Sequence, residues 1–166
     1  MEYRSGEYVM YGTAGICRID GRERRSFDGV HEVEYCRLIP YGEGSSVYFV
    51  PWDTLESKVR RLHSREEVFA LIDSIPRIEP QWTANAAERR ELFGRMLKSD
   101  DYSKIFCLLK SLYSHKHSAG KKLASADERL MKAAEGLVSQ EFSLVLGIRP
   151  DEVEDFIAAR VDGLNA

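Results

Sequence analysis

The 166-residue chain lacks the features of membrane proteins and of secreted disulfide-rich proteins. No run approaches the roughly 18 consecutive apolar residues that a transmembrane helix needs, and the opening residues, MEYRSG, lack the apolar core of a signal peptide. We therefore expect neither export nor a membrane partner, and a cytoplasmic location. Cysteine is also scarce. Cys17, Cys36 and Cys107 are odd in number and widely spaced, which favours three reduced thiols over disulfides.

Motifs for catalysis, cofactors and metal ions are missing as well. There is no Cys-x-x-Cys pair, and Gly12-Thr13-Ala14-Gly15 has neither the lysine nor the helix of a phosphate loop. His115 and His117 are two residues apart, so on a helix their side chains would diverge by roughly 200° and could not share a metal ion. The sequence therefore predicts a protein that is not an enzyme and has no cofactor, bound metal ion or small-molecule substrate.

Charge is distributed unevenly along a chain whose formal net charge is only −3. From Arg89 to Lys132 there are eleven basic residues against five acidic ones, a local net charge of +6. From Glu135 onward seven acidic residues face only Arg149 and Arg160, a local net charge of −5. A basic segment of this kind can bind phosphates, because neutralising them releases condensed counterions. The same pattern also occurs on ordinary solvated lysine faces.

The first sixty residues predict β-structure. Short runs rich in Val, Ile, Tyr and Phe are separated by turn residues, and they span 7–11, 15–24, 30–39 and 46–50. Asp28-Gly29 predicts a hairpin, since a tight turn there requires positive φ. So many short strands in so few residues predict a small, strongly bent sheet or barrel.

After Ser64 the apolar period changes to that of helices. Ser64 to Glu67 has the pattern of a capping box, and Pro76 to Gln81 is typical of a linker. Further helices are expected over 84–97, from about 99 along a stripe to Tyr113, from a second capping box at Ser125–Glu128 to Gly147, and over 150–160. The expected fold class is α+β, with an N-terminal β domain over residues 1–63 and a C-terminal all-α helical bundle over 64–166.

Trp82 stands in the polar context Gln81-Trp82-Thr83, at the junction between the expected linker and the next helix. Two interpretations remain open. The indole could pack under the start of the helix as a hydrophobic staple. It could instead be an exposed aromatic wedge beside a basic helix. Such a wedge inserts between base steps in the minor groove of DNA and partly unstacks them.

Several motifs, in order along the chain, resemble one family. The segment Tyr3–Tyr11 contains a Gly-acid-x-Val-x-Tyr pattern, and the helical half contains Leu97–Asp101, Gly120–Leu123, Asp127–Leu130 and Val145–Ile148. This set resembles the CarD/CdnL family of bacterial RNA polymerase-binding transcription regulators. The resemblance implies a Tudor-like, SH3-like β-barrel that binds the β subunit of RNA polymerase. It also implies a helical domain that contacts promoter DNA at the upstream edge of the bubble and stabilises the open complex.

The resemblance also indicates where the contacts would lie. It places polymerase contacts at Arg25 and at Phe49, where this chain has phenylalanine in place of arginine. It implies that Trp82 enters the minor groove, although the arginines that follow it in many members are delayed here by Thr83–Ala87. The predicted contacts with the phosphate backbone have low sequence specificity and involve basic residues of the helical half. They are Arg89, Arg90, Lys104, Lys116, Lys121, Lys122 and Arg129.

A second class of function is a Tudor-type peptide-binding module with a helical scaffold and no direct role on DNA. Its ligand would be held by an aromatic cage, and the candidate rings are those of Tyr8, Tyr11, Tyr35 and Tyr48. Tyrosines in this position are also typical of a barrel core. A small nucleic-acid enzyme is a third class, but the sequence lacks an acidic cluster that could bind its metal ions.

Overall fold

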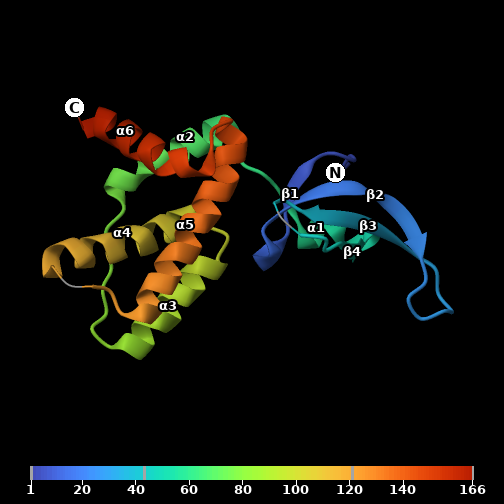
Figure 1. Ribbon diagram of the computed structural model, residues 1–166, viewed down its shortest axis with the longest axis horizontal. Coiled ribbons are helices and arrows are strands. Elements are labelled where there is room, and N and C mark those ends of the chain that lie inside the picture. The colour runs from blue at the N-terminus through green and yellow to red at the C-terminus, as the bar shows by residue number, and fades with distance from the viewer. Residues whose placement is uncertain (1, 43, 121, 166) are drawn as a thin grey trace. The chain divides into compact units, whose positions relative to one another are not determined.

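The computed structural model describes residues 2–42, 44–120 and 122–165. The chain divides into two compact units, Met1–Leu62 and His63–Ala166, one residue before the expected boundary. All the described strands belong to the first unit, and helices make up the second (Figure 1). The fold class is therefore α+β.

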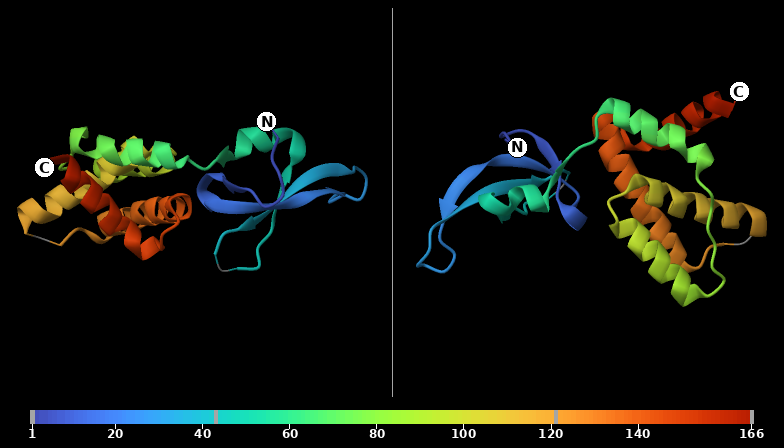
Figure 2. Two further views of the ribbon diagram at one scale, coloured as in Figure 1. Left: turned by 90° about the horizontal axis from the view of Figure 1, so that it is seen from above. Right: turned by 180° about the vertical axis from the view of Figure 1, so that it is seen from behind.

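The first unit contains an antiparallel sheet of five strands in the order β4-β3-β2-β1-β5. The strands are β1 (Tyr8–Met10), β2 (Ile16–Arg25), β3 (Val33–Pro40), β4 (Tyr48–Pro51) and β5 (Arg60–Arg61). Short helical segments also occur at η1 (Gly12–Ala14), η2 (Trp52–Thr54) and α1 (Leu55–Lys58). The sequence did not predict α1 or β5, because elements this short carry too little periodicity. Figure 2 shows the long β2–β3 hairpin from two sides.

Alternation along the strands buries one face of this sheet. Val9, Cys17, Ile19 and Leu38 are almost completely buried, and so is Cys36. The two cysteines are free thiols in the core, and burial raises the pKa of Cys36 to about 11. The pairing of β2 with β3 shifts register after Ile19. The β2 residues that follow therefore point to the opposite face of the sheet from the one that strict alternation would give.

The β2–β3 connection is longer than the expected tight hairpin and runs over residues 26–32. Gly29 has a φ of 78°, as the turn signal required. The Asp28 carboxylate accepts hydrogen bonds from the backbone N–H groups of Val30 and His31, both at 2.8 Å. These bonds, with the His31 ring, hold the pKa of Asp28 far below its usual range. Asp28 therefore orders the loop through side-chain bonds, which a two-residue turn would not need.

The second unit contains α2 (Arg65–Ser74), η3 (Ile75–Arg77), α3 (Ala86–Lys98), α4 (Tyr102–Ala119), α5 (Ser125–Leu146), η4 (Pro150–Glu152) and α6 (Val153–Asn165). The Ser64 hydroxyl caps α2 by accepting a hydrogen bond from Glu67 N, and Gly147 ends α5 in the left-handed conformation, as predicted. The capping box expected at Ser125–Glu128 is wrong. Ser125 is already helical, and Asp127 points into the interior, where it binds an arginine.

Helix α5 packs against α2, α3, α4 and α6. The predicted stripe on α4 is confirmed, with Phe106 and Leu112 buried against Phe142 of α5 in a single core. The core also holds the fully buried carboxylate of Glu141. It accepts hydrogen bonds from the His63 backbone N–H and the Tyr102 hydroxyl, both at 2.8 Å. No helix in the described ranges is long and apolar enough to cross a bilayer.

Candidate functional site

The two positions expected to contact polymerase lie together on the sheet. Arg25 ends β2, Phe49 lies on β4, and β3 runs between them. The Arg25 guanidinium carbon is 4.7 Å from the centroid of the Phe49 ring, in a cation–π arrangement. Side chains from two strands that are not neighbours thus form one contact surface.

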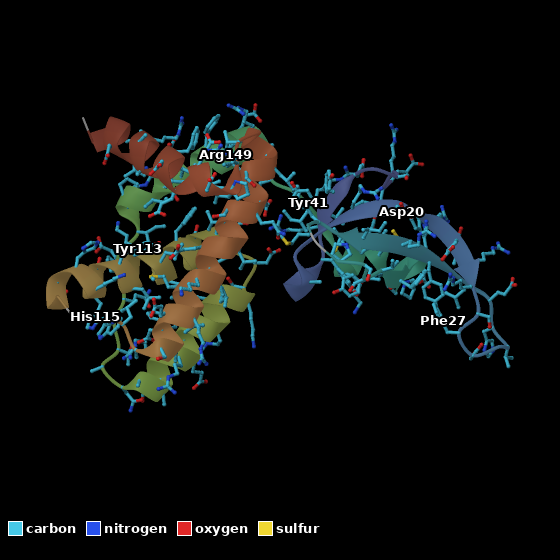
Figure 3. The ribbon with its side chains drawn as sticks, viewed as in Figure 1. Asp20, Phe27, Tyr41, Tyr113, His115 and Arg149 are labelled. Atoms are coloured by element: carbon cyan, nitrogen blue, oxygen red, sulfur yellow. The ribbon has the colours of Figure 1, made fainter. Side chains whose placement is uncertain are left out.

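Two further aromatic rings extend this contact. The Phe27 ring lies edge-on to Tyr35 at 5.2 Å and to Phe49 at 5.5 Å between centroids. Phe27 follows β2 at the base of the hairpin loop (Figure 3), and it is 62% exposed. We call Arg25, Phe27, Tyr35 and Phe49 the sheet-face cluster. Exposed aromatic rings beside an arginine are typical of the anchor residues of protein interfaces.

Ion pairs hold the arginines of this face in place. Arg25 Nε lies 3.0 Å from Glu23 Oε1, and Arg37 reaches both Glu23, at 3.6 Å, and Asp20. A third arginine, Arg18, lies 3.3 Å from Asp20. The Arg37 guanidinium holds the pKa of Asp20 below its usual range. This row of alternating charges orients Arg25 toward the Phe49 ring, so the cluster is preformed.

Residues 3–63 match the family model of the CarD-like/TRCF RID domain. The match covers the first compact unit from residue 3 onward and one residue of the second unit. The N-terminal unit is a CarD-like/TRCF RID domain. This domain is the RNA polymerase-interacting domain of its family, where its partner is the β subunit, and it gives the chain a transcription-related, polymerase-binding role. A comparison of the chain with curated proteins found no match.

The four tyrosines considered for an aromatic cage divide into separate groups. Tyr8 packs edge-on against Tyr41 at 5.6 Å, and Tyr11 against Tyr48 at 5.4 Å. Tyr35 belongs to the sheet-face cluster of the RID domain. A cage requires several rings around one cation, and the ring-to-ring contacts among the described residues do not bring these four together.

Trp82 lies in a stack within the helical unit. Its indole is 3.6 Å from the His115 ring at an interplanar angle of 8°, and the Arg89 guanidinium lies 4.4 Å from its centroid. Phe93 contacts it edge-on at 6.3 Å. Trp82 is still 38% exposed. The residue thus combines features of both interpretations, since His115 and Arg89 pack on the ring while part of the side chain reaches solvent.

Arg89 has a structural role that the sequence did not predict. The residue is only 7% exposed, and its guanidinium binds the buried Asp127 carboxylate at 2.9 and 3.2 Å. It also donates a hydrogen bond to the Thr83 carbonyl at 2.9 Å. These bonds connect α3 and α5 with the segment that carries Trp82. Because the guanidinium is buried and saturated, we remove Arg89 from the phosphate-contacting set.

The expected linker at Pro76–Gln81 is held against α4. Lys110 Nζ donates to the carbonyls of Ile75 and Ile78, at 2.9 and 2.7 Å, and the Gln81 N–H donates to the Ser111 hydroxyl at 2.8 Å. Lys110, one of the eleven basic residues counted above, is therefore occupied within the protein.

The other predicted phosphate contacts fall into two places. Arg90, Lys116 and Arg129 are exposed and lie near the ends of α3, α4 and α5 that meet around Trp82, and the exposed Lys122 lies in the connection between α4 and α5. We call these four residues and Trp82 the helix-end surface. Lys104 is exposed near the start of α4, twelve residues before Lys116 and thus about 18 Å away along the helix. Lys121 lies outside the described residues.

Within the described ranges, no group of three or more His, Cys, Asp or Glu side chains is arranged to hold a metal ion. The two surfaces differ in composition. One presents aromatic rings with a cation, and the other presents cations around a partly exposed indole.

Proposed function

We propose that this protein is a transcription regulator that binds the β subunit of RNA polymerase through the sheet-face cluster. In this proposal its helical unit contacts promoter DNA at the upstream edge of the bubble and stabilises the open complex. The β unit corresponds to a Tudor-like barrel, and the helical unit to a DNA-contacting bundle. The observation that carries the proposal is the contact between Arg25 and Phe49 inside a domain of the RID family.

The chemistry of the cluster supports a protein partner. Arginine and aromatic side chains lose little conformational freedom on binding when they are already ordered, and they bury large areas. Phe27 and Phe49 supply the apolar part, and Arg25 supplies hydrogen-bond donors for an acceptor on the partner.

The helix-end surface supports contact with nucleic acid. Its four exposed cations suit phosphates without base readout, which agrees with low sequence specificity. Trp82 would enter the minor groove with its exposed part, while His115 and Arg89 support the ring.

The test of the polymerase contact is Arg25→Glu in the full chain, with binding to core RNA polymerase measured by biolayer interferometry. The substitution removes a favourable contact and adds repulsion, so we expect binding to weaken roughly tenfold or more. Arg24→Glu is the matched control. It makes the same change in charge one residue earlier, on the opposite side of the strand. Equal weakening by both variants, or none by a folded Arg25→Glu protein, would remove Arg25 from the interface.

A further inference from the structure

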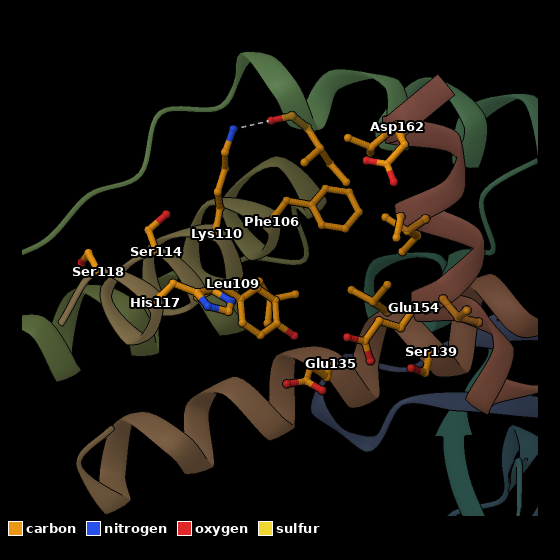
Figure 4. A pocket seen from close by; sticks show the side chains of 17 residues that line it. Phe106, Leu109, Lys110, Ser114, His117, Ser118, Glu135, Ser139, Glu154 and Asp162 are labelled. Atoms are coloured by element: carbon orange, nitrogen blue, oxygen red, sulfur yellow. Dashed lines mark hydrogen bonds between the residues drawn. The ribbon is translucent and has the colours of Figure 1, made fainter. Parts of the chain in front are cut away.

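A groove of about 930 Å³ lies within the helical unit, and none of its lining residues belongs to the two surfaces described above. Figure 4 shows its walls, which come mainly from α4, α5 and α6. Each helix contributes side chains spaced three or four residues apart, so one face of each is turned toward the same space. The apolar part of the lining includes Phe106, Leu109, Val138, Val153, Ile157 and Val161.

Carboxylates dominate the charge of this groove. Glu135 of α5 and Glu154 of α6 approach each other across it (Figure 4). Burial, together with the nearby Glu135 and Glu154 carboxylates, raises the pKa of Tyr113. Asp162 lies farther along α6. The interior of the groove therefore has a negative electrostatic potential.

The described part of the chain supplies little positive charge to balance these groups. Among the described residues, Lys110 is the only lysine or arginine in the lining, and its ammonium donates hydrogen bonds to the carbonyls of Ile75 and Ile78. No ion pair to Glu135 or Glu154 is formed by the described lysines and arginines. An incoming cation would consequently meet carboxylates that have no competing cationic partner.

We propose that the groove binds a small organic cation, a ligand with an apolar body and a protonated amine. The amine lies beside Glu135 and Glu154, and the apolar body lies on Phe106, Leu109 and Ile157. The volume falls in the range of roughly 300–1,000 Å³ that is usual for small-molecule sites, which combine an apolar wall with a few polar groups. An anion of the same shape is disfavoured by the carboxylates. This site does not depend on the proposed function.

Two probes with one body and opposite charge test the proposal, 4-phenylbutylamine and 4-phenylbutyrate. Each is titrated into the full chain, and methyl chemical shifts are followed by NMR. We expect shifts at Leu109, Val138 and Ile157, with the amine binding about tenfold more tightly than the carboxylate, as two partly exposed carboxylates allow. Equal affinity of the two probes, or shifts confined to other parts of the chain, would overturn the proposal.

Neighbouring alanines on α6 provide a matched pair of variants. Ala158 lines the groove, whereas Ala159 does not, and both are exposed, so a larger side chain is tolerated at either position. Ala158→Trp should lower the affinity for the amine at least about tenfold by filling the groove, and Ala159→Trp should leave it within about twofold. Unchanged binding by a folded Ala158→Trp protein would contradict the site.

A second variant tests the preference of the groove for a cation, and it keeps the proposal testable if Ala158→Trp fails to fold. Replacing Glu135 and Glu154 together with Gln should bring the affinities of the two probes to within about twofold of each other. Asp155 is exposed and lies on α6 beside Glu154, but it does not line the groove, so Asp155→Asn should retain the preference for the amine. A preference that survives the double substitution would show that these carboxylates do not bind the amine.

Discussion

Two arginine–aromatic pairs, one from each unit of the protein, differ in how far the arginine is available to a partner. Arg25 lies 4.7 Å from Phe49 in the RID domain, and Arg89 lies 4.4 Å from Trp82 in the helical unit. Each arginine also binds a carboxylate, Glu23 or Asp127. The Arg25 side chain is 50% exposed, however, whereas that of Arg89 is 9% exposed.

The difference shows that an arginine–aromatic pair does not by itself indicate a binding site. On the sheet face the carboxylate is partly solvated, so Arg25 keeps donors for a partner. At the helix ends Asp127 is buried, and Arg89 uses its donors within the fold. The two cases differ in how deeply both the arginine and its acidic partner are buried.

The largest effect is expected for Asp127→Ala. Removing this carboxylate leaves the Arg89 guanidinium buried without its partner, which should lower the free energy of unfolding by about 3–5 kcal/mol. Urea denaturation followed by far-ultraviolet circular dichroism measures the change. Glu128→Ala, at an exposed neighbouring position, should change the stability by less than about 0.5 kcal/mol. A similar loss in both variants would mean that helix N-terminal charge, and not the buried pair, is responsible.

Trp82→Ala should have a smaller effect on folding and a distinct one on DNA. Because the ring is partly exposed, its truncation should cost about 1–3 kcal/mol, below the range of roughly 3–5 kcal/mol of a fully buried aromatic residue. If the indole also supports the melted promoter, open complexes formed with polymerase should collapse faster. The competitor-challenged lifetime of these complexes measures this effect. His115→Ala, which removes the stacked ring but leaves the indole, separates support of the ring from contact by it.

Phe27→Ser should weaken polymerase binding while leaving the fold intact. The ring is mostly exposed, so the stability should change by less than about 0.5 kcal/mol, whereas an interface anchor is worth roughly tenfold or more in affinity. Binding to core polymerase and thermal melting are measured on the same samples. Val30→Ser, at a 78% exposed position of the same loop, is the control. If Val30→Ser weakens binding as much, the loop and not the aromatic cluster forms the contact.

The smallest effect concerns the salt dependence of DNA binding. Replacing Lys116 and Lys122 together with Ala should reduce the slope of log affinity against log salt by roughly one for each phosphate that the protein no longer neutralises. Lys104→Ala, at the other end of α4, should leave the slope unchanged if DNA lies on the helix-end surface. Fluorescence anisotropy at several salt concentrations gives both slopes, and a fall in slope only for Lys104→Ala would relocate the DNA.

Strong local patterns were predictable from the sequence. Alternation located the long strands, and the stripe of α4, the cap at Ser64 and the stop at Gly147 were identified because each depends on neighbouring residues. The capping box at Ser125 failed because the helix begins one residue earlier, with Ala124 as its N-cap, so Ser125 is already helical. Asp127, in the first turn, binds Arg89, which lies 38 residues away in the sequence. A buried ion pair between residues so far apart in the sequence leaves no local pattern from which it could be predicted.

The surfaces were predictable only in part. Arg25 and Phe49 were named separately, but their contact depends on the register of β2, β3 and β4. Phe27 was missed, although an aromatic residue beside the polar turn signal Asp28-Gly29 could have indicated an exposed ring. The groove was also missed, since periodicity shows which face of a helix is apolar but not whether another element fills the space beside it.

The hydrogen bonds that hold residues 75–81 against α4 affect the rate at which Trp82 associates with a partner and the entropic cost of that association. A tryptophan on a free linker would sample many orientations, and binding would have to restrict them at an entropic cost. Here Lys110 and Ser111 fix the approach to Trp82 before any partner arrives. Most of the ordering is therefore completed during folding. The segment therefore holds Trp82 rigidly before binding. Substitutions that loosen this segment should change the entropy of DNA binding, although they alter no group that contacts the DNA.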